Sequence, residues 1–357
     1  MAREPPGFHT IYVTFIAWPQ PKERYGMLRS MTLALAAALA LALPAVAQDK
    51  PTLTIYTYDS FAAEWGPGPA LKTGFEATCN CTIAFVGADD SISALRRVQL
   101  EGATTKADLV VGLDNFIAGD ARATGLFAPH GLDLSGLSLP EPWTDTDFVP
   151  FDYGYFAFVY NKETTPMPPA SFEELIALPD DFKIVVMDPR SSTPGLGLVV
   201  WLRAAYGDRA PEIWAALKPH ILTMSRGWSE GYGLFLKGEA DMALSYSTSP
   251  AYHVVAENDE RYAAAEFSEG HLAQVEVSGI LKSSPHQDLA RDFLAYMASV
   301  EGQKVIPTTN WMFPVIDLGA DLPPSFGPQP KKLLEIDEAT VTANRNAWIE
   351  EALAAIR

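Results

Sequence analysis

The sequence FVPFDYGYFAFVY, at residues 148–160, is a long aromatic run that follows a loop-rich segment at 131–147. Aromatic and β-branched residues at this density favour an extended strand. We interpret the run as the crossover from a first domain into a second. The alternating pattern QVEVSGIL at 274–281, followed by a predicted helix at 287–298, indicates that the chain then returns to the first domain.

The segment before the crossover alternates between strand and helix patterns. Apolar stretches at 53–58, 82–86 and 107–112 predict strands, and helices are predicted between them at 69–77 and from 91 through 101. The short continuous run ADLVVG is typical of a strand that is buried on both faces of a parallel sheet. This order predicts an α/β unit.

The segment after the crossover repeats the alternation. Predicted strands lie at 183–187, 222–225 and 241–245, and predicted helices at 195–206, 210–217 and 229–237. An amphipathic helix is expected at 337–356. The fold class we expect is therefore α/β with two lobes, of which residues 48–147 plus 275–357 form the first and residues 148–274 the second.

Length and charge agree with this division and restrict the function. A chain of 357 residues favours two domains over one. The formal net charge is -18, and removal of residues 1–47 leaves a still more acidic body. Such a charge disfavours nucleic acid and anionic membranes as partners, and it tolerates a cationic ligand.

The segment MLRSMTLALAAALALALPAVA, at 27–47, has the pattern of a secretory signal peptide with cleavage before Gln48. The mature protein is therefore expected outside the cytoplasm. Residues 1–26 do not fit ahead of a signal peptide, and we interpret them as a mis-assigned N-terminal extension, with Met27 as the start. No later apolar run approaches the length of a membrane span.

The two cysteines of the chain are Cys79 and Cys81, separated by one residue. An oxidising compartment permits a disulfide between them, but so short a ring is strained, and two free thiols remain the alternative. The six histidines are scattered. No metal site is predicted, because zinc needs more ligands than this pair supplies.

The stretch RGWSEGYGLFLKGEADMALSYSTSPAYH, at 226–253, mixes aromatic residues with hydroxyls and glycines. Such residues are typical of turns and exposed backbone rather than of packed interior. Similar clusters occur at 54–69 and 191–197, and Trp311 stands between polar turn residues. We expect these clusters to share one cleft, although ordinary strand-to-helix junctions explain the same residues.

Two predicted helix starts carry hydroxyl or acidic groups. Ser192 and Thr193 precede a proline at the first turn of one helix, and Asp90 and Ser91 begin another. Free backbone N–H groups and the helix dipole make such starts anion sites, so two facing starts would hold one phosphate. The Lys of a P-loop is missing, which argues against nucleotide hydrolysis. A capped surface helix remains the alternative.

The sequence Gly-Trp-Ser-Glu-Gly at 227–231 matches the nucleophile-elbow pattern G-x-S-x-G. Histidines exist downstream at His253, His271 and His286, but no HGGG-like oxyanion loop does. Ser229 as the N-cap of the following helix explains the same residues. We therefore interpret this segment as structural rather than catalytic.

Several long segments resemble one known family, the periplasmic thiamine-binding proteins of bacterial thiamine ABC transporters. They are YTYDSFAAEWGPGP, CNC, ADLVVGLDN, FVPFDYGYFAFVYNK, DPRSSTPGLGL, GWSEGYGLFLKGEAD, LSYSTSPAYH, FSEGH and IPTTNWMFPV. The resemblance covers nearly all of the chain after residue 47. It implies a two-lobed type II periplasmic binding protein with its ligand cleft between lobes that two crossover strands join.

The resemblance also implies a function and a set of contacts. The protein would capture thiamine, thiamine phosphate or thiamine diphosphate in the periplasm, deliver it to a membrane permease and need no cofactor. The family's ligand contacts fall on Asp90, Ser91, Ser192, Thr193, Trp228, Tyr246, Ser247, Thr248 and Ser249, and matching cleft aromatics are Tyr252, Trp311 and Tyr58. Ser91 stands where we expect Gly in the family, which reduces room close to the ligand.

Two alternatives stay open. The same fold could hold another solute, such as ferric ion, a polyamine or an anion, although ferric sites in related proteins typically use adjacent tyrosines, which this chain lacks. A secreted serine hydrolase that uses Ser229 is the alternative from another class.

Overall fold

The computed structural model describes residues 50–357. The predicted signal peptide at 27–47 and the extension at 1–26 lie outside the described residues. Within residues 50–357, none of the helices combines the length and the apolar character needed to cross a membrane.

One mixed sheet organises the described chain. Its strands follow the order β2-β1-β3-β10-β5-β8-β6-β7. The bounds of these strands are β1 (Thr52–Tyr58), β2 (Thr82–Ala88), β3 (Leu109–Asp114), β5 (Phe148–Asn161), β6 (Ile184–Met187), β7 (Ile221–Ser225), β8 (Met242–Tyr246) and β10 (His271–Leu281). Four short strands pair alongside β5 or β10, namely β4 (Phe127–Ala128), β9 (Tyr262–Ala264), β11 (Phe313–Pro314) and β12 (Leu333–Leu334).

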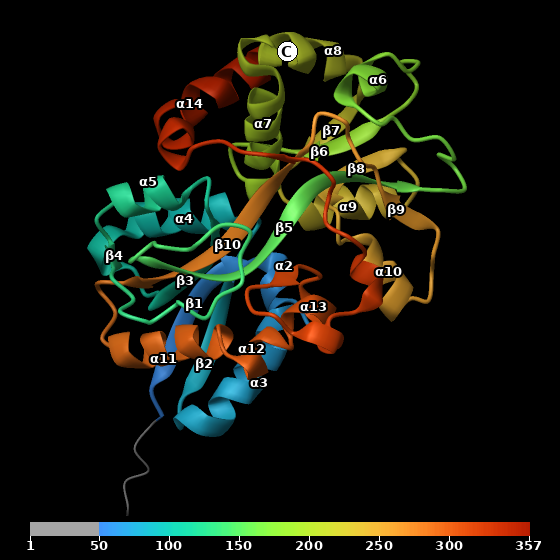
Figure 1. The fold of residues 1–357 in the computed structure, drawn as a ribbon. Coiled ribbons are helices and arrows are strands. Elements are labelled where there is room, and N and C mark those ends of the chain that lie inside the picture. The colour runs from blue at the N-terminus through green and yellow to red at the C-terminus, as the bar shows by residue number, and fades with distance from the viewer. Residues whose placement is uncertain (1–49) are drawn as a thin grey trace, which may run out of the picture. The chain divides into compact units, whose positions relative to one another are not determined.

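The sheet has two parallel groups joined by an antiparallel centre. Strand β1 pairs in parallel with β2 and β3, and β6 pairs in parallel with β7 and β8. Between these groups β10 pairs antiparallel with β3 and β5, and β5 pairs antiparallel with β8. Figure 1 shows β5 in green and β10 in orange running side by side through the centre. The α/β class and the crossover role of β5 are therefore confirmed, while the exact lobe boundaries stay a prediction.

The predicted helices are present with small shifts of their ends. They are α3 (Pro67–Cys79), α4 (Ser91–Glu101), α7 (Thr193–Tyr206), α8 (Ala210–Leu217), α9 (Trp228–Leu236), α11 (Gln287–Met297) and α14 (Glu338–Ala355). Shorter helices that sequence patterns did not predict are α2 (Asp59–Ala62), α5 (Ala118–Ala123), α6 (Phe172–Ile176), α10 (Pro250–Ala256), α12 (Val300–Gln303) and α13 (Ile306–Thr309). Most of these hold only a turn or two, too little for a periodic pattern.

The terminal helix α14 lies against α7 and α8, and also against α5 (Figure 1). The guanidinium of Arg203 on α7 packs over the ring of Trp348, 5.1 Å from its centroid, and forms an ion pair with Glu351. The last helix thus contacts helices that follow β3 and helices that follow β6, so it links both parallel groups.

The core beside β5 is built from aromatic side chains. Every residue of β5 from Phe148 to Val159 is buried, because this central strand has neighbours on both edges and helices over its faces. Phe158 stacks against Trp201 and Phe267 at centroid distances of 6.2 Å and 5.7 Å. The buried Trp201 indole donates to the Gly270 carbonyl at 2.8 Å, which satisfies its one polar group.

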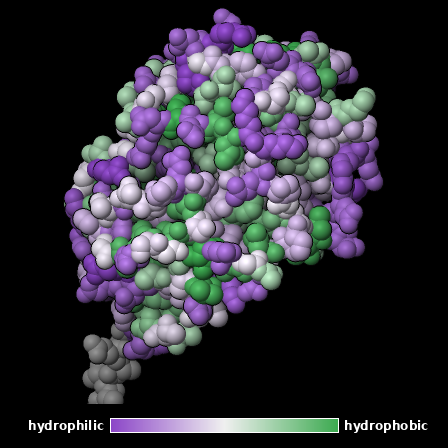
Figure 2. All heavy atoms as spheres, viewed as in Figure 1, coloured by the Kyte–Doolittle hydropathy of each residue, from purple (hydrophilic) through white to green (hydrophobic). Residues whose placement is uncertain are grey.

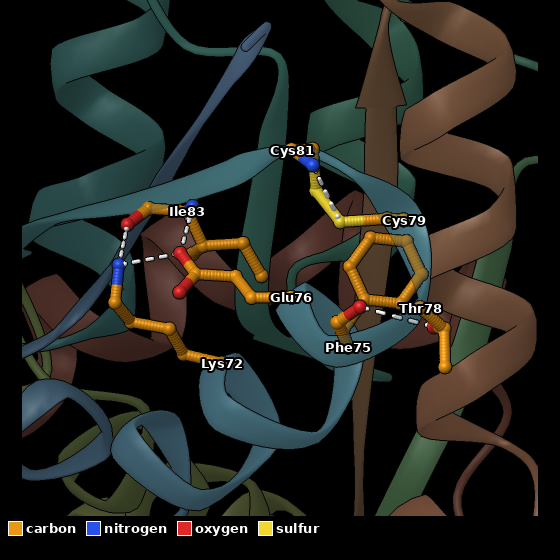
Figure 3. The surroundings of a disulfide bond; sticks show 7 residues. All are labelled: Lys72, Phe75, Glu76, Thr78, Cys79, Cys81 and Ile83. Carbon is orange, nitrogen blue, oxygen red and sulfur yellow. Dashed lines mark hydrogen bonds and ion pairs between the residues drawn. A yellow bond between two sulfur atoms is a disulfide. The ribbon is translucent and has the colours of Figure 1, made fainter.

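The cysteine pair, left open by the sequence, forms a disulfide in the structure. Figure 3 shows Cys79, at the end of α3, bonded to Cys81, just before β2. Earlier on α3 the Lys72 ammonium donates to Glu76 Oε1 at 2.7 Å, and the Ile83 amide of β2 donates to that same oxygen at 2.6 Å. The bond and these contacts fasten α3 to the first residues of β2.

The surface is largely hydrophilic on the face drawn in Figure 2, where hydrophobic residues form small separate patches. Among the described residues the most exposed large apolar side chains are Leu100 and Met167. Helix α4 therefore buries Val98 and leaves Leu100 in solvent.

A pair of helix glycines tests the packing between α7 and β5. A Cβ at Gly197 would lie 2.1 Å from the ring of the buried Phe156, whereas a Cβ at Gly233 on α9 would meet nothing within 4 Å. Gly197→Ala should lower the free energy of unfolding by about 1–3 kcal/mol because the core cannot expand. Gly233→Ala should raise it by up to about 1 kcal/mol through helix propensity. Thermal and urea unfolding measure both, and equal effects would contradict this packing.

Candidate ligand-binding cavity

A cavity of about 300 Å³ opens where the two parallel groups of the sheet meet its antiparallel centre. Nine of the twelve site residues predicted from the sequence line it, namely Tyr58, Asp90, Ser91, Thr193, Trp228, Tyr246, Ser249, Tyr252 and Trp311. The chain segments that were expected to share one cleft therefore do meet. The lining also contains Tyr232, one of the aromatic residues of the stretch 226–253 that were expected in the cleft, and Glu276 and Asn310, which the sequence analysis did not select.

The other three predicted residues lie behind the lining. Ser192 is fully buried and is the N-cap of α7. The Ser247 amide donates to the Tyr155 carbonyl at 2.8 Å, which ties its loop to β5. The Thr248 hydroxyl is buried and has no hydrogen-bond partner in the structure.

One wall of the cavity is formed by Trp228 and Tyr232 on α9. Their rings stack at 4.9 Å with an angle of 17° between the planes. The Trp228 Nε1 donates to Ser245 Oγ at 2.8 Å, and that hydroxyl lies 2.7 Å from Ser249 Oγ. Stacking and hydrogen bonding together hold the Trp228 indole in one orientation, so its π face is a fixed surface.

A second wall is formed by Trp311 and Tyr252, whose rings meet edge to face at 5.4 Å and 72°. Trp311 has a φ of 57°, in the left-handed region, and its amide donates to the Ile306 carbonyl at 3.1 Å. A left-handed conformation is costly for a bulky residue and is found where the surrounding structure enforces it. The backbone strain is thus located at a residue that lines the cavity.

Tyr58, at the end of β1, depends on a bulge in the neighbouring strand. Gly112 is the unpaired residue between Val111 and Leu113 in the pairing of β3 with β10. Its φ is 97°, which favours glycine, and a Cβ there would lie 2.3 Å from the Tyr58 ring. Gly112 therefore supplies both the bulge and the room for the tyrosine.

Glu276, at the floor of the cavity, belongs to a row of three buried carboxyls in neighbouring strands. Glu276 on β10 is paired directly with Asp114 on β3 and with Asp152 on β5. Residues that are directly opposite in a sheet point to the same face with Cβ atoms about 5 Å apart. We call Asp114, Glu276 and Asp152 the acid row. Their exposed fractions are 0%, 6% and 0%, so water cannot screen them from one another.

The acid row is only partly satisfied by hydrogen bonds. Glu276 accepts from the Tyr58 hydroxyl at 2.7 Å, and Asp152 Oδ2 accepts from the Asn310 amide at 2.6 Å. Asp114 Oδ1 accepts two backbone amides, but Asp114 Oδ2 and Asp152 Oδ1 have no partner. Within residues 50–357, no Lys, Arg or His side chain lines the cavity to neutralise these groups.

Burial favours the protonated forms of the acid row, although the charge of Arg345 opposes the rise in the pKa of Asp114. Burial raises the pKa of Asp114 to about 7 and the pKa of Asp152 to about 8. Burial, and then the neighbouring Asp152, raise the pKa of Glu276 well above its usual range. A cation bound beside these carboxyls would stabilise their ionised forms and so lower all three pKa values. The electrostatics of the cavity therefore favour a cationic ligand.

Asp90 lies at the meeting point of three helix starts. Its carboxylate accepts from the Ser91 amide at 2.7 Å, from the Thr193 amide at 3.3 Å and from the Trp228 amide at 3.2 Å. These amides belong to the first turns of α4, α7 and α9. Burial raises the pKa of Asp90, and these hydrogen bonds oppose the rise.

The expectation that Ser229 caps α9 is wrong. The helix begins at Trp228 with Gly227 as its N-cap, because the Asp90 carboxylate, rather than a local hydroxyl, receives the Trp228 amide. A Cβ at Gly227 would lie 2.4 Å from the Asp89 carbonyl, so only glycine fits this approach. Ser229 is exposed, one residue inside the helix.

None of the histidines proposed as partners is hydrogen-bonded to Ser229 among the described residues. His253 is fully buried, with Nε2 3.0 Å from the Tyr232 hydroxyl and Nδ1 2.6 Å from Glu257. His271 uses both ring nitrogens on backbone groups of Phe267 and Phe156. The geometry of a nucleophile elbow with its base is not formed here.

Sequence reasoning missed the acid row, although it contained a usable signal. Each of its members is the lone acidic residue in an otherwise apolar strand stretch, as in GLD, PFDYG and QVEVS. Isolated charges in a buried strand are rare unless they have a partner or a function. That the three lie side by side follows only from the strand order.

The family model for bacterial extracellular solute-binding proteins matches residues 51–304. The chain belongs to this family. It is 50% identical over 304 residues to the thiamine-binding periplasmic protein of Escherichia coli (strain K12), covering 85% of this chain and 92% of that protein. It is 48% identical over 331 residues to the protein of the same name from Brucella suis biovar 1, covering 92% and 98%.

A solved structure agrees with these relatives. A periplasmic thiamin-binding protein superimposes with a TM-score of 0.84 at 49% identity and covers 86% of this chain and 97% of that chain. The periplasmic binding protein fold expected from the sequence is therefore confirmed for this solute-binding protein, as is the resemblance to relatives that bear the name thiamine-binding periplasmic protein.

The acid row predicts how stability depends on pH. Asp152 has a folded pKa of about 8, above the ordinary value of 3.8, so between these values only the unfolded chain gives up the proton. The ligand-free protein should therefore lose stability as pH rises from 6 to 8. Asp152→Asn should flatten this decline and raise the thermal midpoint at pH 8 by a few degrees.

The matched control is Asp133→Asn, because Asp133 is exposed and its pKa is lowered by hydrogen bonds from Ser135, outside this pH window. Thermal unfolding at pH 6, 7 and 8 measures both variants. If Asp152→Asn and Asp133→Asn gave the same pH profile as the unchanged protein, the buried acid row would not be protonated as described.

Proposed function

We propose that the protein is the extracytoplasmic solute-binding component of an ABC importer, that it binds thiamine and its mono- and diphosphate esters, and that it delivers them to the permease at the inner membrane. The observation that carries the proposal is a cavity with aromatic walls, an acidic floor and, among the described residues, no cationic side chain in its lining. Such a cavity suits a flat organic cation.

Thiamine matches the cavity part by part. Its thiazolium ring carries a positive charge that would interact favourably with the carboxyls of the acid row. Its aminopyrimidine ring offers a flat face for Trp228 or for the Tyr252 and Trp311 pair, and polar edges for the hydroxyls of Tyr58 and Ser249. The phosphate of an ester would have the starts of α4, α7 and α9 as its partners.

The relatives support this ligand and this location. Proteins 48–50% identical over nearly their whole length are named thiamine-binding periplasmic proteins. With the predicted signal peptide at 27–47, we propose export to the periplasm. The acidic charge of the chain fits a cationic vitamin rather than nucleic acid.

We propose that the protein has no hydrolytic activity of its own. Ser229 is exposed in the first turn of α9, without a hydrogen-bonded histidine among the described residues. The ferric alternative has less support because the hydroxyls of Tyr58, Tyr246 and Tyr252 donate to Glu276, Gln274 and Glu257 instead of facing one shared point.

We propose further that residues 48–147 with 275–357 and residues 148–274 act as lobes that close over the ligand. Strands β5 and β10 would serve as the connections. The hydrogen bonds of Asp90 with Thr193 and Trp228 would then join the lobes in the closed state.

The Trp228 wall provides the test of the ligand. The protein should bind thiamine in an isothermal titration, and Trp228→Ala should weaken binding roughly ten-fold to a hundred-fold, because stacking and cation–π attraction contribute on the order of 1–3 kcal/mol. Trp228→Phe should recover part of the loss, since Phe keeps a π face. Trp228→Leu should recover less despite similar apolarity.

The control is Trp348→Ala, on α14 and outside the cavity lining, which should leave thiamine affinity unchanged. If Leu served as well as Phe, Trp228 would be an apolar wall without a cation–π role. If the unchanged protein failed to bind thiamine, the proposed function itself would be wrong.

A further inference from the structure

The anion position at the helix starts is already filled by a side chain of the protein. The Asp90 carboxylate receives three backbone amides from α4, α7 and α9, and the Thr193 hydroxyl lies 3.4 Å from Asp90 Oδ1. The helices have 11, 14 and 9 residues, so each has a developed dipole that favours negative charge at its start. A ligand phosphate would be attracted to the same amides.

Asp90 does more than cap its own helix. Only its bond with Ser91 belongs to α4, whereas Thr193 and Trp228 are 103 and 138 residues away along the chain. A local N-cap satisfies one or two amides of the helix that it begins. The Asp90 side chain therefore acts as a shared anion for three separate elements.

A second observation indicates that the starts of α4, α7 and α9 can bind an anion with more acceptor oxygens than a carboxylate. The Ser192 hydroxyl is fully buried and forms no hydrogen bond in the structure. As the N-cap of α7, Ser192 directly precedes Thr193, whose amide donates to Asp90. A buried hydroxyl without a partner is costly, and a phosphate has more acceptor oxygens than a carboxylate to receive it.

We propose that Asp90 is an internal anion that sets the preference among thiamine esters. This rests on the proposed function and deepens it. With unesterified thiamine bound and the lobes closed, the Asp90 carboxylate stays at the starts of α4, α7 and α9. An ester places its phosphate there only by displacing the carboxylate, since two anions cannot share one set of amides without strong repulsion.

Asp90 is on this account a specificity-determining residue. Free thiamine adds its cation to the acidic floor and leaves the Asp90 hydrogen bonds intact. A phosphate ester gains the helix starts but loses the bonds between Asp90 and Thr193 and Trp228. The lost hydrogen bonds of Asp90 offset part of the binding free energy that the phosphate gains at the helix starts. The preference for an ester over free thiamine is therefore smaller than the helix starts alone would give.

The test compares two ligands in two variants. Asp90→Ser removes the carboxylate but keeps a hydroxyl that caps α4. Asp89→Ser removes the same charge one residue away, from a cavity-lining side chain that pairs with Arg226 at 3.7 Å. Titration calorimetry with thiamine and with thiamine phosphate gives the ratio of the two dissociation constants. General losses of stability cancel in this ratio, and Asp89→Ser measures the shift that comes from the lost charge alone.

Asp90→Ser should shift the ratio at least about ten-fold towards the ester, which corresponds to one decade of dissociation constant at about 1.4 kcal/mol. Asp89→Ser removes the same charge without freeing the amides at the helix starts, so it should shift the ratio by less. A ratio in Asp90→Ser equal to that of the unchanged protein would overturn the proposal. If Asp90→Ser does not fold, Asp90→Asn supplies the same comparison with the shape of the side chain kept.

Inorganic phosphate gives a readout that does not depend on thiamine. It should raise the thermal midpoint of Asp90→Ser and leave the midpoints of the unchanged protein and of Asp89→Ser where they are. A rise in all three proteins would show that phosphate binds without displacing Asp90 and would overturn the proposal. Failure of the unchanged protein to bind thiamine would instead contradict the proposed function.

Discussion

The pairing of Glu276 with Asp114 on one side and Asp152 on the other is the constraint on which the cavity depends. Three like groups in adjacent strands, all buried, oppose folding when they are ionised. The surrounding structure accommodates them with a bulge at Gly112, a register shift beside Glu276, and hydrogen bonds from Tyr58 and Asn310. A cation bound beside Glu276 would offset the cost of this arrangement.

The cavity has regions of different chemical character. Carboxyls form the floor, Trp228 and the Tyr252 and Trp311 pair form the walls, and helix starts meet at Asp90. Strands β3, β10 and β5 carry the acid row, while the walls come from segments on both sides of them. Strands β5 and β10 thus connect the halves of the sheet and also carry Asp152 and Glu276.

Local patterns predicted the elements well because each element's pattern lies within a few residues. The aromatic run of β5, the alternation of β10 and the start of α7 at Ser192 were all predicted from residues that are adjacent in sequence. The acid row was not, because its members lie on strands whose order no local pattern specifies. The start of α9 at Trp228 was missed for the same reason, since its capping carboxylate comes from Asp90.

The measurement that tests this account most directly is the number of protons exchanged when thiamine binds, obtained from titrations at pH 7 in buffers with different heats of ionisation. A cation at the floor lowers the raised pKa values of Asp152 and Glu276, so the account predicts proton release on binding. Asp152→Asn should release fewer protons. Binding with no exchange of protons, or with proton uptake, would contradict the claim that the acid row holds the cation.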